Sequence, residues 1–325
     1  MPPVCFVTGA SGFLARAFVP MLAPSHRLRL LVRDGQQLPQ FAGIDHQPVI
    51  GRLDDEAALR QGCDGADVVA HLAALVSFRP EDRARSFAVN EAGTARLAAI
   101  ARERGVRRFL HVSTISAIGY RDDRTLLDET APYNFGPLRC GYCDSKFAAE
   151  QRVLDEVRRG LDAVIVNPPS MYGPGDSRKG DDSLLGAVFA GRVRMAPPGG
   201  LNVAAVDDVC RGMLAALARG RSGERYLLGG ENLTGRELLE RIARVIGGTA
   251  PRRTVPRWLM LVGAAALRAK ERCFGSKAPL TSEVLRLGAR FLWYSSAKAE
   301  RELDWRAGPV DPGIRAAWDE LRASD

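Results

Sequence analysis

The stretch "VCFVTGASGFLA", residues 4–15, constrains the fold of this chain more than any other segment. An apolar, β-branched run leads into a pattern that places Gly9, Gly12 and Ala15 at intervals of three residues. Glycine lets the backbone approach a pyrophosphate closely, and a helix that starts here offers free N–H groups and the positive end of its dipole. The pattern predicts a strand, a phosphate-binding turn and a helix inside a βαβ unit, with a plain tight turn as the alternative.

Four more apolar runs suit the same kind of unit. They read "LRLLVR", "VVAHLAA", "RFLHVST" and "AVIVNPP", and helical patterns such as residues 90–104, closed by Gly105, lie between them. Successive strand–helix units form a parallel sheet with helices on both faces. The sequence therefore predicts an α/β fold with a Rossmann-type doubly wound parallel sheet.

The second half of the chain has a different texture, with Gly/Pro-rich loops after about residue 168. Residues 1–167 are predicted to form the dinucleotide-binding domain, to which the chain returns at about 204–230. Residues 168–203 and 231–325 are predicted to form a smaller substrate-binding lobe that covers the carboxyl edge of the sheet. In this lobe, Thr234 and Glu237 form a capping box that opens a helix running towards Ile246.

Composition sets limits on partners and location. The chain has 325 residues, of which 46% are hydrophobic, enough for a sizeable core. Its net charge of +8 comes from cations scattered among acids, so we expect no nucleic-acid partner. The six cysteines lack the spacing of a disulfide framework, and the first strand begins almost at Met1, so we expect a cytoplasmic protein without a signal peptide. Cys140 and Cys143 form a single CxxC without further ligands nearby, and no metal is expected.

The longest apolar run, "WLMLVGAAAL" at residues 258–267, is about half as long as a membrane span. We therefore expect no stable membrane insertion. A buried helix is the favoured interpretation, and a helix that faces substrate or touches a membrane is left open.

Tyr142 and Lys146 form the most informative pair of polar residues. Five of the 46 cations are lysines, which leaves 41 arginines, and Lys146 is the only lysine among the first 178 residues. Residues four apart share one face of a helix, so both side chains can point into one cleft. A cation at about 4 Å, at an effective dielectric of ~20, favours the phenolate by up to roughly 4 kcal/mol. The pair thus predicts a lowered Tyr142 pKa suited to proton transfer, unless the spacing arises by chance.

Six motifs in order resemble the extended short-chain dehydrogenase/reductases. They are "TGASGFLA", "HLAA", "VNEAGT", "VSTISAIG", "YCDSK" and "NPPSMYGPGD", and the resemblance covers nearly the whole chain. The family includes NAD(P)-dependent epimerases and dehydratases, dihydroflavonol-type reductases and 3β-hydroxysteroid-type dehydrogenases, and the last two branches are the most similar. The resemblance implies an NAD(P)-dependent enzyme.

The same resemblance assigns roles to individual residues. Tyr142 would exchange a proton with the substrate oxygen, Lys146 would assist it and hold the cofactor ribose, and Thr114 would bind the same oxygen, with Ser113 and Ser116 as substitutes. Besides Tyr142 and Lys146, the implied cofactor-binding residues are Gly9, Ser11, Gly12, Phe13, Leu14, Arg33, Leu53, Ala73, Ala74, Val76, Pro169 and Ser170.

The cofactor type depends on the end of the second strand. Arg33 there favours NADP(H), because a cation accommodates the extra phosphate, whereas Asp34 leaves NAD(H) open. One motif departs from the family: residues 51–53 read Gly-Arg-Leu where Gly-Asp-Leu is usual. Asp54 or Asp55 would have to replace the missing acid.

The resemblance implies hydride transfer by a ketone reductase or alcohol dehydrogenase acting on a hydrophobic, polyketide-, steroid- or flavonol-like molecule. Ile115 and Ser116 stand where dehydratases of the family carry Asp and Glu, which disfavours dehydration. A sugar-nucleotide epimerase and a non-catalytic NADP-binding sensor remain the alternatives, and a homodimer is left open. Candidate substrate-lining residues are Leu75, Phe78, Met171, Trp258, Leu259 and Met260.

Overall fold

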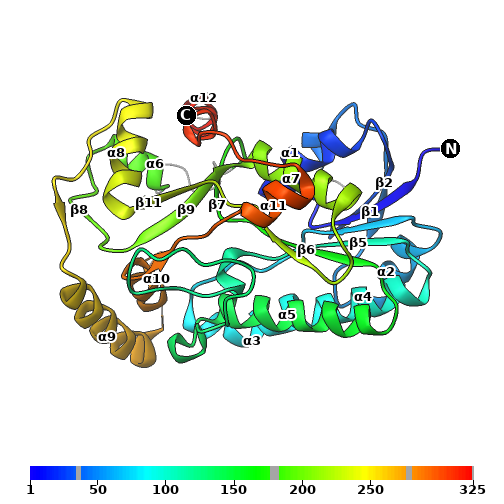
Figure 1. The fold of residues 1–325 in the computed structure, drawn as a ribbon, viewed down its shortest axis with the longest axis horizontal. Coiled ribbons are helices and arrows are strands. Elements are labelled where there is room, and N and C mark those ends of the chain that lie inside the picture. The colour runs from blue at the N-terminus through cyan, green and yellow to red at the C-terminus, as the bar shows by residue number, and fades with distance from the viewer. Residues whose placement is uncertain (34–37, 176–182, 276–279, 324–325) are drawn as a thin grey trace.

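A computed structural model of the protein describes residues 1–33, 38–175, 183–275 and 280–323. Its centre is a seven-stranded sheet in which every neighbouring pair is parallel (Figure 1). The strand order is β3 (His46–Ile50), β2 (Arg27–Val32), β1 (Val4–Thr8), β4 (Val68–His71), β5 (Arg108–Val112), β6 (Ala163–Asn167) and β10 (Arg225–Leu227). The predicted α/β class is confirmed.

Helices cover both faces of this sheet (Figure 1). One face carries α1 (Phe13–Leu22), α7 (Val206–Arg219) and α11 (Ala297–Leu303), and the other carries α2 (Glu56–Cys63), α4 (Gly93–Glu103) and α5 (Gly141–Arg158). Side chains alternate along a strand, so Cys5 and Val7 enter the first core while Val4 and Phe6 enter the second. The sheet is therefore buried on both faces, as its continuous apolar runs predict.

The helix expected at residues 90–104 begins in an unusual way. The short α3 (Arg83–Ser86) leads into a π-helical turn, Phe87–Ala92, before α4, and Gly105 then ends the helix with φ +69°. The wide turn directs the Asn90 side chain inward, where it bonds the Leu75 N–H at 2.7 Å and the Ser145 hydroxyl at 2.9 Å. Asn90 thus ties the loop after β4 to α5.

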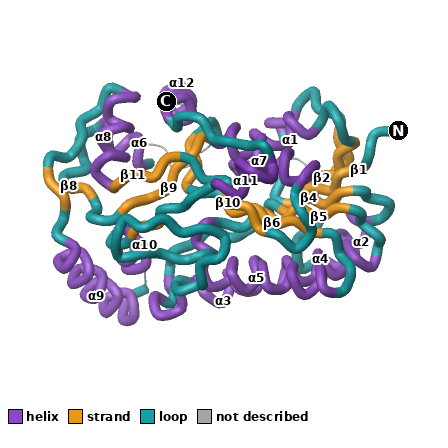
Figure 2. The backbone as a smooth tube through the Cα atoms, in the orientation of Figure 1, coloured by secondary structure: helices purple, strands orange, loops and turns teal. Residues whose placement is uncertain are grey.

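A second, four-stranded sheet lies beside the first (Figure 2). It contains β7 (Ser170–Tyr172), β9 (Gly200–Ala205), β11 (Glu231–Thr234) and β13 (Phe291–Leu292), while β8 (Met195–Ala196) pairs with β12 (Arg253–Thr254). The helices of this part are α6 (Leu184–Phe189), α8 (Gly235–Ile246), α9 (Arg257–Phe274), α10 (Ser282–Gly288) and α12 (Asp311–Ala323). The exact domain limits stay a prediction.

The structure tests two local expectations in this part of the chain. The capping box of α8 is confirmed, because Thr234 Oγ1 accepts from the Glu237 N–H at 3.2 Å and Glu237 Oε2 accepts from the Thr234 N–H at 2.8 Å. The buried helix expected at residues 258–267 is wrong, because much of α9 is exposed. In the described ranges, no helix combines the length and apolar character that crossing a membrane requires.

Candidate active site

The loops that carry the predicted site residues meet at one edge of the main sheet. All seven strands are parallel, so their carboxyl ends share that edge. In sheet order, the residues that follow these ends are Pro169 and Ser170 (β6), Thr114 (β5), Ala73, Ala74 and Val76 (β4), Gly9 (β1), Arg33 (β2) and Leu53 (β3). The predicted site thus forms one continuous row across six neighbouring strands.

The turn between β1 and α1 fits a diphosphate. Gly9 has φ +77°, and a Cβ at this position would lie 2.6 Å from the Ala73 backbone nitrogen. Gly12 is the N-cap residue of α1, and its N–H donates to the Gly9 carbonyl at 2.9 Å. A glycine cap has no side chain over the first helical N–H groups, which leaves room for an anion. Ser11, Phe13 and Leu14 are half-buried in the same turn.

The positions nearest the predicted adenosine end differ in exposure. Arg33 is exposed as the first residue after β2, while Asp34 lies outside the described residues. Leu53 is buried next to Gly93, and its carbonyl accepts from Arg96 Nη1 at 2.9 Å. Both its side chain and its backbone carbonyl therefore have defined partners.

The two acids considered as replacements already have partners. Asp54 pairs with Arg52 at 3.3 Å on the surface, and Asp55 caps α2 by accepting from the Ala58 N–H at 3.0 Å. Asp55 therefore stabilises the start of α2, and Asp54 forms a surface ion pair. Both carboxylates thus have local roles.

In the loop after β4, Ala73 is half-buried whereas Ala74 and Val76 are exposed. At β6, Pro169 is buried, and the half-buried Ser170 begins β7.

Tyr142, Lys146 and Thr114 come together at the carboxyl end of β5. Tyr142 and Lys146 lie one turn apart in the first half of α5, and both are buried. Lys146 Nζ donates to the Val112 carbonyl at 2.8 Å. The Thr114 hydroxyl lies beside Tyr142 and accepts from the Ser116 N–H at 3.2 Å. The structure thus brings together all three residues proposed for catalysis.

The predicted lowering of the Tyr142 pKa is wrong for this geometry. Burial raises the pKa of Tyr142 well above its usual range, although the neighbouring Thr114 hydroxyl acts to lower it. Burial also lowers the pKa of Lys146 to about 8, and Glu150 opposes this effect. Desolvation disfavours the charged form of both groups, and it outweighs the attraction that the lysine charge would exert on the phenolate.

Glu150 is a buried charge that the sequence argument missed. It lies one turn beyond Lys146 on α5, accepts from Asn167 Nδ2 at 2.6 Å and pairs with Arg225 at 3.2 Å. Burial raises the pKa of Glu150, and Arg225 and the Ser113 hydroxyl act to lower it. Ser113 thus faces this carboxylate whereas Thr114 faces Tyr142, which favours Thr114 over Ser113 as the substrate-binding hydroxyl. The four-residue spacing of residues 142, 146 and 150 is the sequence signal that places Glu150 on the same helix face as the other two.

Two buried histidines lie beneath the same site. His71 lies between the hydroxyls of Thr8 and Thr94, at 2.7 and 2.8 Å, and its ring is 5.4 Å from that of His111. Burial, with a smaller contribution from Lys146, lowers the pKa of His71 to about 3, and it also lowers the pKa of His111. Both rings are therefore neutral at physiological pH.

Of the candidate substrate-lining residues, Phe78 packs against Tyr142. Its ring packs edge-on against the Tyr142 ring with centroids 5.4 Å apart, and its carbonyl accepts from Thr281 Oγ1 at 2.7 Å. Leu75, Met171 and Met260 are half-buried. Trp258 and Leu259 lie instead on the exposed side of α9.

Cys140 and Cys143 flank Tyr142 as buried, free thiols. Cys140 caps α5, and Cys143 Sγ donates to Cys140 Sγ at 2.6 Å. Burial raises the pKa of Cys143, which makes it a poor nucleophile.

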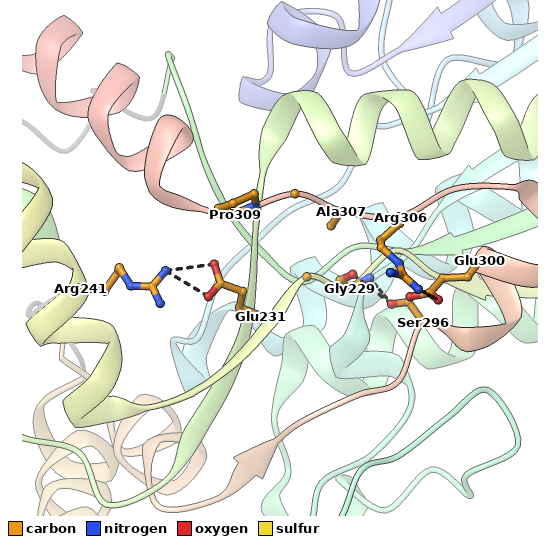
Figure 3. Close-up of a pocket in the computed structure, with 10 residues that line it drawn as sticks. Gly229, Glu231, Arg241, Ser296, Glu300, Arg306, Ala307 and Pro309 are labelled. Atoms are coloured by element: carbon orange, nitrogen blue, oxygen red, sulfur yellow. Dashed lines mark hydrogen bonds and ion pairs between the residues drawn. The ribbon is translucent and has the colours of Figure 1, made fainter.

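A cavity of about 580 Å³ lies elsewhere, between the β10–β11 connection and the segment before α12 (Figure 3). Its charged side chains already pair with each other, Arg241 with Glu231 at 3.0 Å and Arg306 with Glu300 at 2.7 Å. None of the three proposed catalytic residues lines it. The charged side chains of the cavity thus have partners within the protein and do not call for a ligand. The carboxyl edge of the main sheet, which holds the three proposed catalytic residues, remains the candidate active site.

Known proteins resemble this chain in sequence and in fold. Residues 5–229 match the model of the NAD dependent epimerase/dehydratase family. The chain is 33% identical to sterol demethylase protein B of Methylococcus capsulatus, over 96% of this chain and 95% of that protein. It is 36% identical to the 4-hydroxy-2-methyl-3-oxo-4-farnesyl-3,4-dihydroquinoline-1-oxide ketoreductase of Stigmatella aurantiaca, over 69% and 67%. The crystal structure of gox2253 superposes with a TM-score of 0.86 at 32% identity, covering 99% of this chain and 98% of that one.

Proposed function

Because the chain belongs to the NAD dependent epimerase/dehydratase family and is an NAD(P)-dependent oxidoreductase of the short-chain dehydrogenase/reductase type, we propose that it acts on an apolar ketone or the corresponding alcohol. NADP(H) is the proposed cofactor, and the substrate class is a flat hydrophobic molecule of the polyketide, steroid or flavonol kind. The observation that carries the proposal is the buried group formed by Thr114, Tyr142 and Lys146 next to the Phe78 ring.

The nicotinamide supplies or accepts the hydride when it is bound. In reduction, Tyr142 donates its proton to the oxygen on which negative charge develops, and the Thr114 hydroxyl donates a hydrogen bond to the same oxygen. The raised pKa of Tyr142 keeps the phenol protonated at neutral pH, so the proton that the developing alkoxide needs is in place. The Lys146 ammonium, held by the Val112 carbonyl, then stabilises the phenolate that remains.

The residues around the site support an apolar substrate. The Phe78 ring lies against Tyr142, and the exposed Val76 lies in the same loop, so hydrocarbon surface lies next to the tyrosine. Ile115 and Ser116 form a buried 3-10 turn where an elimination reaction would need an acid and a base. Two of the compared proteins are named for a sterol and for a farnesyl-bearing quinoline, which supports the same class.

Arg33 supports the choice of NADP(H). It is an exposed cation at the carboxyl end of β2, on the predicted adenosine side of the phosphate turn. A guanidinium at this place matches the geometry of a phosphate group better than that of a ribose diol.

Turnover of the purified protein tests this function. We expect NADPH consumption with flat apolar ketones and none with nucleotide sugars. Arg33→Ser should raise the KM for NADPH about tenfold and leave that for NADH within about twofold, since one charged hydrogen bond is lost. Arg107→Ser, at the amino end of β5, is the matched control and should change neither value. Turnover of a nucleotide sugar without turnover of any apolar ketone would overturn the proposal.

A further inference from the structure

Helix α9 presents an unusual outer face. It lies at one end of the molecule, far from the seven-stranded sheet (Figures 1 and 2). Trp258, Leu259 and Val262 are 67%, 45% and 58% exposed. The exposed stripe continues with the uncharged residues Gly263, Ala265, Ala266 and Ala269. An exposed apolar surface of this kind is typical of an interaction site rather than of an ordinary solvated helix.

Charges surround this stripe at both of its ends. Arg252 and Arg253 are exposed just before α9, and Lys270 and Arg272 are exposed in its last turns. The acid of the helix, Glu271, is buried and does not offset these cations at the surface. An apolar centre between cationic ends complements an anionic phospholipid surface, where acyl chains lie beneath negative headgroups.

One more cation, at the start of α9, belongs to an ion pair. Arg257, in the first turn, shares the Asp122 carboxylate with Arg290, so it is paired rather than free at the surface. The exposed cations that remain are those on either side of the apolar stripe.

Helix α9 is also connected to the candidate active site through named contacts. The Glu271 carboxylate accepts from the Ser282 N–H and hydroxyl, at 2.9 and 2.5 Å, which fixes the start of α10. The preceding residue, Thr281, donates to the Phe78 carbonyl at 2.7 Å, and Phe78 packs against Tyr142. The outer helix and the tyrosine are therefore joined by a short chain of hydrogen-bonded and packed residues.

We propose that α9 docks on the surface of an anionic phospholipid bilayer, with Trp258, Leu259 and Val262 at the boundary between headgroups and acyl chains. The helix lies in the plane of the interface and does not cross it. Docking would let an apolar substrate pass from the bilayer to Phe78 and Tyr142. This last step rests on the proposed function, whereas the docking itself does not.

Vesicle binding by the full-length chain tests the proposal. Vesicles of phosphatidylcholine with phosphatidylglycerol should sediment the protein, and vesicles of phosphatidylcholine alone should bind about tenfold less, with a loss of binding in high salt. Binding should also shift the tryptophan emission to the blue, because Trp258 is largely exposed while Trp293 is half-buried and Trp305 and Trp318 are buried.

Matched variants localise the effect. Trp258→Ser combined with Val262→Ser should reduce vesicle binding at least about tenfold and abolish the blue shift. Ile50→Ser, at a side chain that is 54% exposed on β3, should bind as the parent protein does. Both variants change exposed side chains, and an unchanged Tm verifies that they fold.

Several results would overturn the docking proposal. One is equal sedimentation with anionic and neutral vesicles, and another is full binding by the double variant. A dimer that the double variant loses, without vesicle binding by the parent, would show that a second copy covers α9.

Turnover separates the two proposals. The double variant should keep its turnover of a water-soluble ketone and lose at least about tenfold on a ketone dissolved in anionic vesicles. A protein that binds vesicles through α9 but reduces no ketone would support docking and contradict the proposed function.

Discussion

Lys146 Nζ donates a hydrogen bond to the Val112 carbonyl, 2.8 Å away, and thereby fixes a buried ammonium at the carboxyl end of β5. Val112 lies two residues before Thr114, so the same strand end orients the lysine and carries the hydroxyl next to Tyr142. The lysine is compact enough for this place, whereas the larger planar guanidinium of arginine requires a different set of acceptors.

Exchange of this lysine for arginine separates charge from geometry. Lys146→Arg keeps the positive charge but should lower kcat at least about a hundredfold, because the planar guanidinium of arginine does not fit the space next to the Val112 carbonyl. Steady-state turnover with the best ketone measures the effect, and Lys270→Arg on the surface of α9 serves as the control. If Lys146→Arg retained more than half of the turnover, a geometric role for the lysine would be excluded.

The buried lysine should also give a pH-dependent stability. Its pKa of about 8 in the folded protein lies below the unfolded value, so the unfolded chain binds more protons between about pH 8 and 10.5. The cost of burying the ammonium is fully present below this range and disappears above it. From pH 7 to pH 10, the parent should therefore gain about 2 kcal/mol of unfolding free energy relative to Lys146→Met, measured by urea denaturation. A difference that is constant across this range would contradict the assigned pKa shift.

His111 should produce the same trend with pH, but in the acid range. Its pKa in the folded protein is lowered by burial and by Lys146. Below about pH 6.5 the imidazole therefore takes up a proton in the unfolded chain, whereas it stays neutral in the folded protein. Stability from the neutral ring is present above this pH and is lost as the pH falls. Between pH 6.5 and 4.5, the parent should lose more unfolding free energy than His111→Leu, measured by urea denaturation. Parallel pH profiles for the two proteins would show that the ring protonates freely in the fold.

Gly9 is expected to be required by packing as well as by the cofactor. Gly9→Ala combines φ +77° with a Cβ only 2.6 Å from the Ala73 nitrogen, whereas Gly65→Ala has φ +62° and open space around its Cβ. Gly65→Ala should cost about 1 kcal/mol, and Gly9→Ala should cost at least about 2 kcal/mol more. Equal losses in urea denaturation would mean that the approach of the Ala73 backbone carries no energetic cost.

The sequence predicts most of the sheet because buried parallel strands appear as continuous apolar runs, as in β1, β5 and β6. It misses β3, an edge strand whose sequence "HQPVI" contains a proline and mostly half-buried or exposed residues. The Tyr142 and Lys146 spacing and the α8 capping box are local, so a linear pattern is enough to find them.

Other features depend on contacts between distant segments. Glu150 meets Asn167 and Arg225 only after three elements pack together, and the desolvation that raises the Tyr142 pKa also arises from packing. The outward orientation of α9 has the same origin, since an apolar run alone does not determine which side of a helix is covered.

The measurement that tests the central claim most directly compares Tyr142→Phe with the parent in turnover and in dinucleotide affinity. Removal of one hydroxyl leaves the ring beside Phe78 in place, so the Kd for NADPH should stay within about twofold. The kcat for ketone reduction should fall by about 10²–10⁴, the size of a general-acid contribution. A Tyr142→Phe protein that binds NADPH normally and turns over within about tenfold of the parent would contradict the claim that Tyr142 is the proton donor.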